Sequence, residues 1–228
     1  MPDLLNTSLT GMLAFQRALE LTGHNIANAN TPGYSRQVAE FSTRIGGGGG
    51  QTYVGGGTQI HAIKRMYDSL LVDQLRISNT GLARFNALNA LAGRVDTLLA
   101  DPDTGLNEGL QNFFNTLQDV ANDPAELPIP QALLGEAEGL VNRFQSMDDR
   151  LSTLESEVND RVRFAVEDIN RIASEIADVN DRIAVAGVGA RPNDLLDRRD
   201  QLVLELSGMI SVSTTIQDDG AMNVFIGS

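Results

Sequence analysis

The sequence predicts a mainly α-helical fold, an elongated helical bundle or coiled coil that contains one very long helix. Three patterns lead to this expectation. Thirteen apolar residues recur in steps of three or four between Leu140 and Ile183, a spacing that places them on one face of a helix. A shorter apolar stripe and a glycine-rich extended segment precede this helix, and a pattern typical of a β-hairpin follows it.

Residues 1–35 are expected to form an N-terminal helix and the corner that ends it. The helix has one apolar stripe and few charges, so it is poorly suited to facing water alone. The stripe includes Leu5, Leu9, Met12 and Leu19. In the corner, Pro32 presets φ and Gly33 accepts a positive φ, which together favour a type II turn. The asparagine side chains before this turn can hydrogen-bond nearby backbone and brace the corner.

Residues 36–64 are predicted to be an extended, glycine-rich connector. Side chains alternate in character along 38–43 and again along 58–63, as they do in β-strands. The glycines between these stretches have no side chains to pack, and we interpret them as a flexible surface loop. A phosphate-binding loop would need a following Gly-Lys-Ser/Thr motif, which this segment lacks.

Residues 65–207 are predicted to form a helical bundle. Its longest helix is expected over about 130–186, with Pro130 well placed as the first residue and Gly187 and Gly189 just after the end. At 1.5 Å per residue this helix would be roughly 85 Å long, far longer than a globular domain needs.

Residues 208–228 are predicted to form a β-hairpin that begins a β-rich domain. Apolar residues alternate with polar ones on both sides of the turn sequence Asp218-Asp219-Gly220. An isolated hairpin is marginally stable in water, so we expect further parts of this domain to lie outside the chain.

Composition narrows the class of protein. The 228 residues include no cysteine, which excludes disulfides, thiolate nucleophiles and cysteine-ligated metals. No apolar run approaches the roughly 18 residues of a membrane-spanning helix, and the N-terminus lacks the pattern of a cleavable signal peptide. Residues 101–228 hold 24 of the 30 acidic residues, which argues against nucleic acid or a membrane surface as a partner.

No group of residues predicts catalysis or metal binding. His24 and His61 have no second ligand at metal-binding spacing, and we interpret both as structural. The segment 101–105 faintly resembles a calcium loop but lacks ligands at positions that require them. The carboxylates of 136–181 are interleaved with arginines, as on a solvated helix face. We therefore expect no enzyme, no catalytic residue, no cofactor and no metal site.

Several motifs resemble those of a known family. Thr10-Gly11-Met12-Leu13-Ala14 and the run from Asn25 to Gln37 are similar to the N-terminal signature of the bacterial flagellar rod, hook and hook-associated family. The segments that are similar to the hook-associated members in particular are 54–60, 65–68 and 193–203. Those members carry a long helical insert, which rod and hook proteins lack. The resemblance covers nearly the whole chain.

The resemblance implies a non-catalytic structural subunit of the bacterial flagellum. Hook-associated members of this kind polymerise at the distal end of the hook and form the junction on which the filament assembles. The implied partners are other copies of the chain, the hook protein, a second hook-associated junction protein, and the flagellar export chaperone and export apparatus. The implied location is the extracellular flagellum, reached without a cleaved signal peptide. Family members pair the N-terminal helix with a C-terminal one, so we expect this chain to be the N-terminal part of a longer protein.

Two sets of residues are assigned to assembly as a hypothesis. The set expected to pack against neighbouring subunits, with an intramolecular core as the alternative, is Leu5, Leu9, Met12 and Leu19. The set expected to shape the corner, with a simple helix cap as the alternative, is Asn25, Asn28, Asn30, Pro32, Gly33 and Tyr34. Rival interpretations are another axial flagellar subunit (hook, rod or second junction protein) and a free-standing coiled-coil binding protein.

Overall fold

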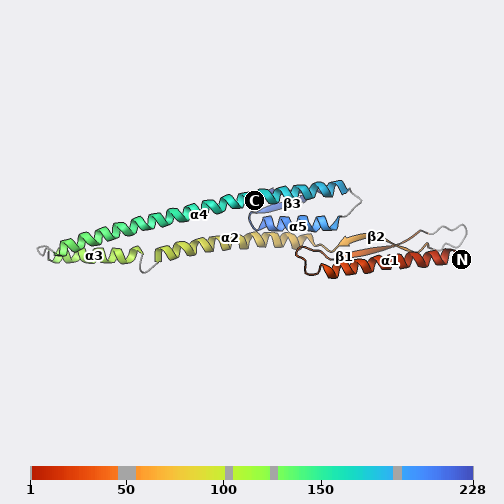
Figure 1. The fold of residues 1–228 in the computed structure, drawn as a ribbon, viewed down its shortest axis with the longest axis horizontal. Helices are drawn as coiled ribbons and strands as arrows, with labels where there is room; N and C mark the ends of the chain where they lie inside the picture. Colours follow the sequence, from red (N-terminus) through yellow and green to blue (C-terminus); the bar gives the residue numbers. More distant parts are fainter. Residues whose placement is uncertain (1, 46–54, 101–104, 124–127, 187–191, 228) are drawn as a thin grey trace. The chain divides into compact units, whose positions relative to one another are not determined.

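The computed structural model describes residues 2–45, 55–100, 105–123, 128–186 and 192–227. These residues form two compact units, one within residues 1–80 and 169–228 and the other within residues 81–168. The elements in chain order are α1 (Pro2–Ala27), β1 (Gln37–Thr43), β2 (Thr58–Arg65), α2 (Ser69–Ala100), α3 (Leu106–Asn122), α4 (Pro128–Ala186), α5 (Asn193–Ser207), β3 (Val212–Ile216) and β4 (Met222–Ile226) (Figure 1). The mainly α-helical fold is therefore confirmed, and α4 alone contains 59 residues.

The long helix begins earlier than its sequence pattern predicts. We expected Pro130 to be its first residue, and this placement was wrong, because α4 starts at Pro128. Proline is tolerated throughout the first turn of a helix, where the backbone N–H groups have no intrahelical partner, so a second proline two residues earlier is compatible with the helix. The helix ends at Ala186. The glycines 187 and 189, expected to end it, lie outside the described residues, as do the glycine run 46–50 and residues 101–104.

The first unit contains an arm, which we define as residues 2–65 and which comprises α1, β1 and β2. The two strands are antiparallel, with Gln37 opposite Arg65 at one end and Thr43 opposite Thr58 at the other. The pairing shifts between Glu40 and Phe41, so that one extra residue of β2 bulges out of the ladder. Helix α1 packs along this hairpin (Figure 1).

The same unit contains a body, which we define as residues 69–80, 169–186 and 192–227. Helix α5 lies between the last turns of α4 and the first turns of α2 (Figure 1). The hairpin of β3 and β4 has five paired positions, from Val212 opposite Ile226 to Ile216 opposite Met222, and Gly220 in its turn has a φ of 87°. The expected C-terminal hairpin is therefore present.

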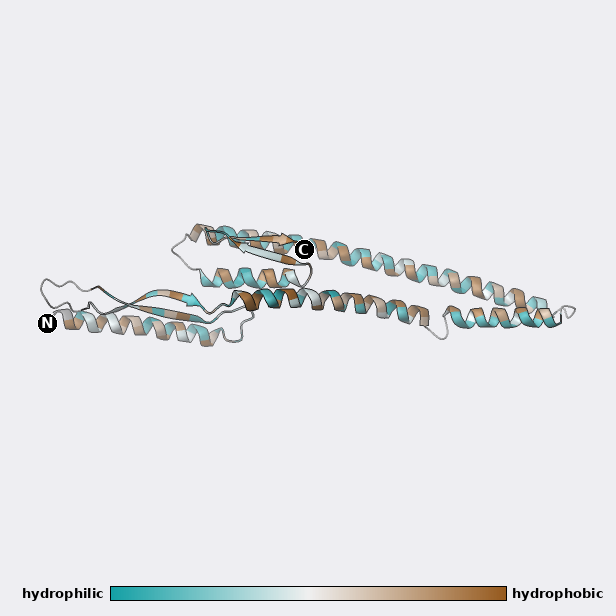
Figure 2. Cartoon of the chain, turned by 180° about the vertical axis from the view of Figure 1, so that it is seen from behind, coloured by the Kyte–Doolittle hydropathy of each residue, from teal (hydrophilic) through white to brown (hydrophobic). Residues whose placement is uncertain are grey.

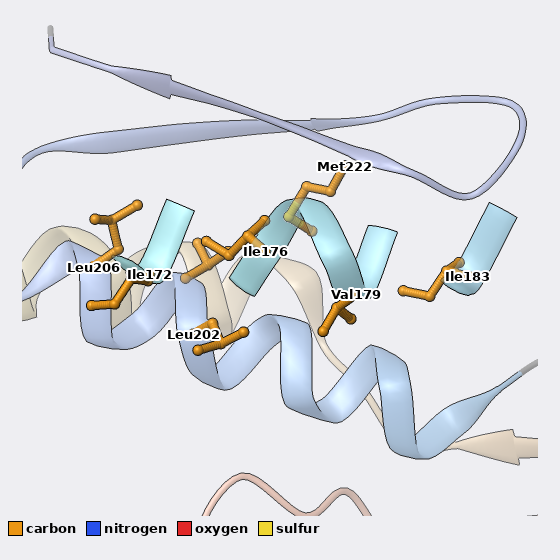
Figure 3. Packing of buried hydrophobic residues seen from close by; sticks show 8 residues of the cluster. Ile172, Ile176, Val179, Ile183, Leu202, Leu206 and Met222 are labelled. Atoms are coloured by element: carbon orange, nitrogen blue, oxygen red, sulfur yellow. The ribbon is translucent and has the colours of Figure 1, made fainter. Parts of the chain in front are cut away.

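One apolar cluster joins α4, α5 and the β3–β4 hairpin of the body, whereas hydrogen bonds from Arg76, Asn79 and Thr80 join α2 to α5. Figure 3 shows side chains of α4 and α5 pointing toward one another, with Met222 of β4 reaching the same cluster. Its buried members are Ile172, Ile176, Val179, Ile183, Leu202, Val203, Leu206 and Met222. These four α4 residues continue the thirteen-residue stripe identified from the sequence, so the C-terminal end of that stripe forms a true core.

The second unit consists of the remaining parts of α2 and α4 together with α3. Gly109 of α3 lets the Arg143 side chain lie close to the α3 backbone, and the Arg143 Nη1 donates a hydrogen bond to the Gly105 carbonyl at 3.1 Å. The Arg94 guanidinium pairs with the Glu157 carboxylate. Met147 is buried here, whereas Phe144 and Val162 of the same stripe are about half exposed. The stripe is thus covered only in part within this unit.

Candidate functional site

Helix α1 has two faces of different character, and the face with the smaller side chains packs against the β1–β2 hairpin. The covered positions recur every three or four residues and are Thr7, Thr10, Gly11, Ala14, Ala18, Leu21 and Asn25. Ala14 is only 4% exposed, and the rings of Phe15 and Phe41 lie 5.6 Å apart at the edge of this contact. Small residues let the helix backbone approach the strands closely, so the larger apolar side chains are left on the other face.

The outward face of α1 carries all four of the stripe residues singled out from the sequence. The exposed fractions are 74% for Leu5, 49% for Leu9, 67% for Met12 and 72% for Leu19. Figure 2 shows apolar residues recurring along the whole of α1. Unlike scattered single apolar residues, a continuous exposed stripe of this kind is typical of a surface that is covered by another element. These residues are therefore available to contact another helix or subunit.

The corner after α1 is built around Asn25. Its Nδ2 donates to the Gln37 carbonyl at 2.8 Å, and its Oδ1 accepts the Gln37 backbone N–H at 2.9 Å. The same Oδ1 accepts the Tyr34 hydroxyl at 2.7 Å, and Tyr34 also lies 3.0 Å from the Nδ1 of His24. One side chain thus connects the helix end, the turn and the first residue of β1.

The turn between α1 and β1 has the geometry expected of its Pro-Gly pair. The Tyr34 N–H donates to the Thr31 carbonyl at 3.2 Å, and Gly33 has a φ of 79°. Asn28 supports the helix end, since its Nδ2 donates to the His24 carbonyl at 3.0 Å. Asn30 and Pro32 are exposed. The structure therefore brings Asn25 and Tyr34 into direct contact and leaves Asn30 and Pro32 facing outward.

A cluster on α5 that joins the arm to the body was missed by the sequence reasoning. Asp197 Oδ2 accepts the Ser35 backbone N–H at 3.0 Å, and its Oδ1 accepts a hydrogen bond from the Arg65 Nη1 at 3.0 Å. The same arginine nitrogen lies 2.6 Å from Asp200 Oδ2. The Asn193 Nδ2 lies 3.2 Å from both the Gln37 Oε1 and the Ile63 carbonyl.

The sequence carries a signal for the α5 side of this cluster, but not for its arm side. Asn193, Asp197 and Asp200 follow one another at intervals of four and three residues, so they share one face of α5. The apolar residues of α5, such as Leu202 and Leu206, lie on the face toward the core. A helix with a polar stripe of uniform carboxylate and amide character points to a partner rich in donors, although the stripe does not identify that partner.

Burial shifts the proton affinities of three groups near this cluster. Desolvation raises the pKa of Tyr34, and the nearby Asp194 and Asp197 carboxylates raise it further. Desolvation, reinforced by Asp200, also raises the pKa of Tyr67. Burial lowers the pKa of Arg199, whose Nη1 donates to the Gly220 carbonyl at 2.7 Å and anchors the turn of the β3–β4 hairpin.

Within the described residues, no group of three or more histidine, aspartate or glutamate side chains is arranged to hold a metal ion. Among the helices that the structure describes, none has the length and apolar character needed to span a membrane. The features that stand out are therefore the exposed stripe of α1, the corner and the polar cluster on α5.

The exposed helix with its corner and the helical part of the chain each match a known family model. Residues 5–34 match the family model of the flagella basal body rod protein. Residues 92–228 match the model described as the flagellar hook-associated protein FlgK helical domain, and the chain belongs to this family.

Individual proteins show the same relationship. The chain is 37% identical, over 98% of its length, to flagellar hook-associated protein 1 of Salmonella typhimurium, and 35% identical to the protein of that name from Escherichia coli. It spans about two fifths of the length of these relatives, 41% and 42% respectively. The solved structure of the flagellar hook junction protein FlgK from Burkholderia pseudomallei superposes with a TM-score of 0.61 at 30% identity, over 67% of this chain and 27% of that one.

Proposed function

We propose that this chain is part of a structural subunit of the bacterial flagellum that assembles at the distal end of the hook and forms the hook–filament junction. The observation that carries the proposal is the 37% identity to a flagellar hook-associated protein 1 over 98% of this chain. The match of residues 92–228, which include the long α4, to the model of the flagellar hook-associated protein FlgK helical domain supports the same role.

The exposed stripe of α1 is the surface proposed to make subunit contacts. Leu5, Leu9, Met12 and Leu19 would bury their apolar area against neighbouring copies, and each fully buried leucine-sized side chain contributes about 2 kcal/mol. In an isolated molecule this area faces water, so assembly supplies a burial that the folded arm does not. A separate groove of about 590 Å³ lies between α1 and β1 on the hairpin side of the helix and is lined in part by Leu21, Ile26 and Phe41.

The corner is proposed to set the direction in which α1 leaves the rest of the chain. Asn25 and Tyr34 lock the helix end to β1, while Gly33 makes the reversal possible. Asn28 would stabilise the last turn of α1, and Asn30 and Pro32, which face outward, would contact neighbouring subunits. A fixed direction matters because subunits in a helical assembly must all present the stripe at the same angle.

The proposed partners are other copies of the chain, the hook protein and a second hook-associated junction protein. During export, the flagellar export chaperone and export apparatus would also bind it. The proposed location is the extracellular flagellum, reached without a cleaved signal peptide. The proposed role is non-catalytic. The strongly acidic composition of residues 101–228 fits an exterior surface, because like charge keeps assembled subunits from clumping laterally.

Electron microscopy of cells that lack the gene, together with an assay for flagellin in the medium, tests the proposal. Hooks without filaments, with flagellin lost to the medium, are expected. Intact filaments would contradict the proposal, and absent hooks would assign the chain to the rod or the hook instead.

A second experiment tests the stripe in the full-length protein expressed in those cells. Leu5→Ser combined with Leu19→Ser is expected to abolish the return of filaments. Ile77→Ser, which changes a helical apolar residue of the body that is 71% exposed, is the control and is expected to restore filaments as the parent does. Restoration by the double variant would show that the stripe makes no essential contact.

A further inference from the structure

The arm and the body touch through polar groups. The apolar cluster of the body and the apolar residues packed against it come from α4, α5 and the β3–β4 segment, and none of them comes from residues 2–65. The hydrogen bonds and ion pairs between arm and body converge on one face of α5. The arm therefore adds no side chain to the apolar cluster and, like α2, is bonded to α5 through polar groups.

Asp197 lies at the centre of this attachment, because it binds two arm segments that are far apart in sequence. One carboxylate oxygen accepts the Ser35 N–H just after the corner, and the other accepts from Arg65 at the end of β2. The Arg65 side chain is 11% exposed, and those of Asp197 and Asp200 are 8% and 12% exposed. The Arg65 guanidinium also stacks over the Tyr67 ring at 4.2 Å. The side chains of Arg65, Asp197 and Asp200 are thus shielded from water, and the charged hydrogen bonds between them hold only in one relative orientation.

Two further contacts hold the start of β1 to the N-terminal turn of α5. The Gln37 side chain accepts from the Asn193 Nδ2 at 3.2 Å and donates to Asp194 Oδ1 at 3.3 Å. A Cβ added at Gly33 would lie only 3.0 Å from the Gln201 side chain, so the corner itself is seated against α5.

We propose that this group is a polar joint that fixes the direction of the arm relative to the body and that can release the arm without unfolding the body. The residues of the joint are Ser35, Gln37, Arg65, Asn193, Asp197 and Asp200. Directional hydrogen bonds favour one orientation. After release, water can replace the lost partners of the joint groups, and the apolar cluster of the body, which contains no residue of the arm, need not open. The proposal deepens the proposed function, on which it rests, by assigning the control of arm direction to particular residues.

The experiment measures one distance in the purified 228-residue chain by double electron–electron resonance. The chain contains no cysteine, so spin labels can be attached at Arg17→Cys on α1 and Asp178→Cys on α4, both of which are exposed positions. The doubly labelled parent is expected to give one narrow distance distribution. Arg65→Gln and, separately, Asp197→Ala are expected to lose it and to give a broad distribution, with the helical circular dichroism and the protection of α5 amides from hydrogen exchange kept.

Asp181→Asn, which neutralises an exposed aspartate of α4, is the matched control and is expected to leave the distribution narrow. A narrow distribution in both joint variants would overturn the proposal. Loss of α5 protection in Arg65→Gln would also overturn it, because the group would then be part of the body's core and not a joint. The distance measurement is made on the purified chain, so its outcome does not depend on whether the chain assembles into a flagellum. A failure of the proposed function would appear in the filament assay alone and would leave the distance measurement standing.

Discussion

The side chain of Asn25 gives the backbone of Gln37 the pair of hydrogen bonds that a neighbouring β-strand would give. The Asn25 Nδ2 donates to the Gln37 carbonyl at 2.8 Å, while its Oδ1 accepts the Gln37 N–H at 2.9 Å. In an antiparallel ladder, two opposite residues exchange bonds in the same way. The last turns of α1 are thereby fixed to the first residue of β1 by one amide group.

Replacing Asn25 is expected to weaken the corner. Asn25→Ala removes the partners of the Gln37 N–H and carbonyl as well as the acceptor of the Tyr34 hydroxyl, and a loss of about 1–3 kcal/mol of local stability is expected. Hydrogen exchange at the Gln37 amide measures this loss directly. Asn30→Ala, at an exposed position of the same turn, is the control, and equal exchange rates in the two variants would contradict the prediction.

Two glycines of the arm are expected to respond to alanine in opposite directions. Gly33→Ala is expected to destabilise the corner by about 1–2 kcal/mol, since φ is 79° and the new Cβ would press on Gln201. Gly23→Ala, in α1 with open space around it, is expected to stabilise the helix by about 0.5–1 kcal/mol. Thermal melting followed by circular dichroism compares the two, and a stabilising Gly33→Ala would be incompatible with the turn described here.

Alanine substitution is expected to destabilise the protein strongly in the core of the body and only slightly in the exposed stripe of α1. Leu202→Ala removes a side chain with 0% exposure and is expected to destabilise the body by about 2–5 kcal/mol. Leu5→Ala, at 74% exposure, is expected to change the stability of the monomer by less than about 0.5 kcal/mol. Hydrogen exchange of α1 amides for Leu5→Ala and of α5 amides for Leu202→Ala, both in the presence of urea, measures the two changes. A large loss of stability in Leu5→Ala would show that the stripe belongs to an intramolecular core.

Alkaline pH is expected to loosen the corner through Tyr34. Its folded pKa is raised, so folding favours the neutral phenol, whose hydroxyl donates to Asn25. This stabilisation is complete below the unfolded phenol's pKa of about 10 and is lost as the pH rises through the higher folded value. Tyrosinate absorbance is followed as the pH of the parent and of Tyr34→Phe is raised. The variant is expected to lack one ionisation that the parent shows above the ordinary range of tyrosine. A component lost in the ordinary range would contradict the expectation.

Local patterns were enough to predict the helices, the C-terminal hairpin and the reversal at Gly33. Each depends on residues within a few positions of one another, so period and turn chemistry suffice. The start of α4 was misplaced by two residues because two prolines are both compatible with a first helical turn. The stripe of α1 was identified, but the small-residue face that packs on the hairpin was not, since glycine and alanine carry little hydropathy signal.

The polar joint could not be predicted from the sequence. Its bonds connect residues 130 to 162 positions apart, such as Ser35 with Asp197 and Asn193 with Ile63. Helical periodicity shows which residues of α5 share a face, but it does not show which arginine or backbone amide they meet. Such pairings depend on how the elements pack against one another, and the local patterns of a single sequence do not reveal this packing.

The separation in sequence of these contacts also bears on the order in which the chain folds. The apolar cluster of the body draws its buried members from residues 172–222, so its contacts close short loops, and contacts of this kind form early. The bonds to Ser35 and Arg65 close loops of well over a hundred residues and can form only on an α5 that is already in place. We therefore expect the arm to be fixed in position after the apolar cluster of the body has formed.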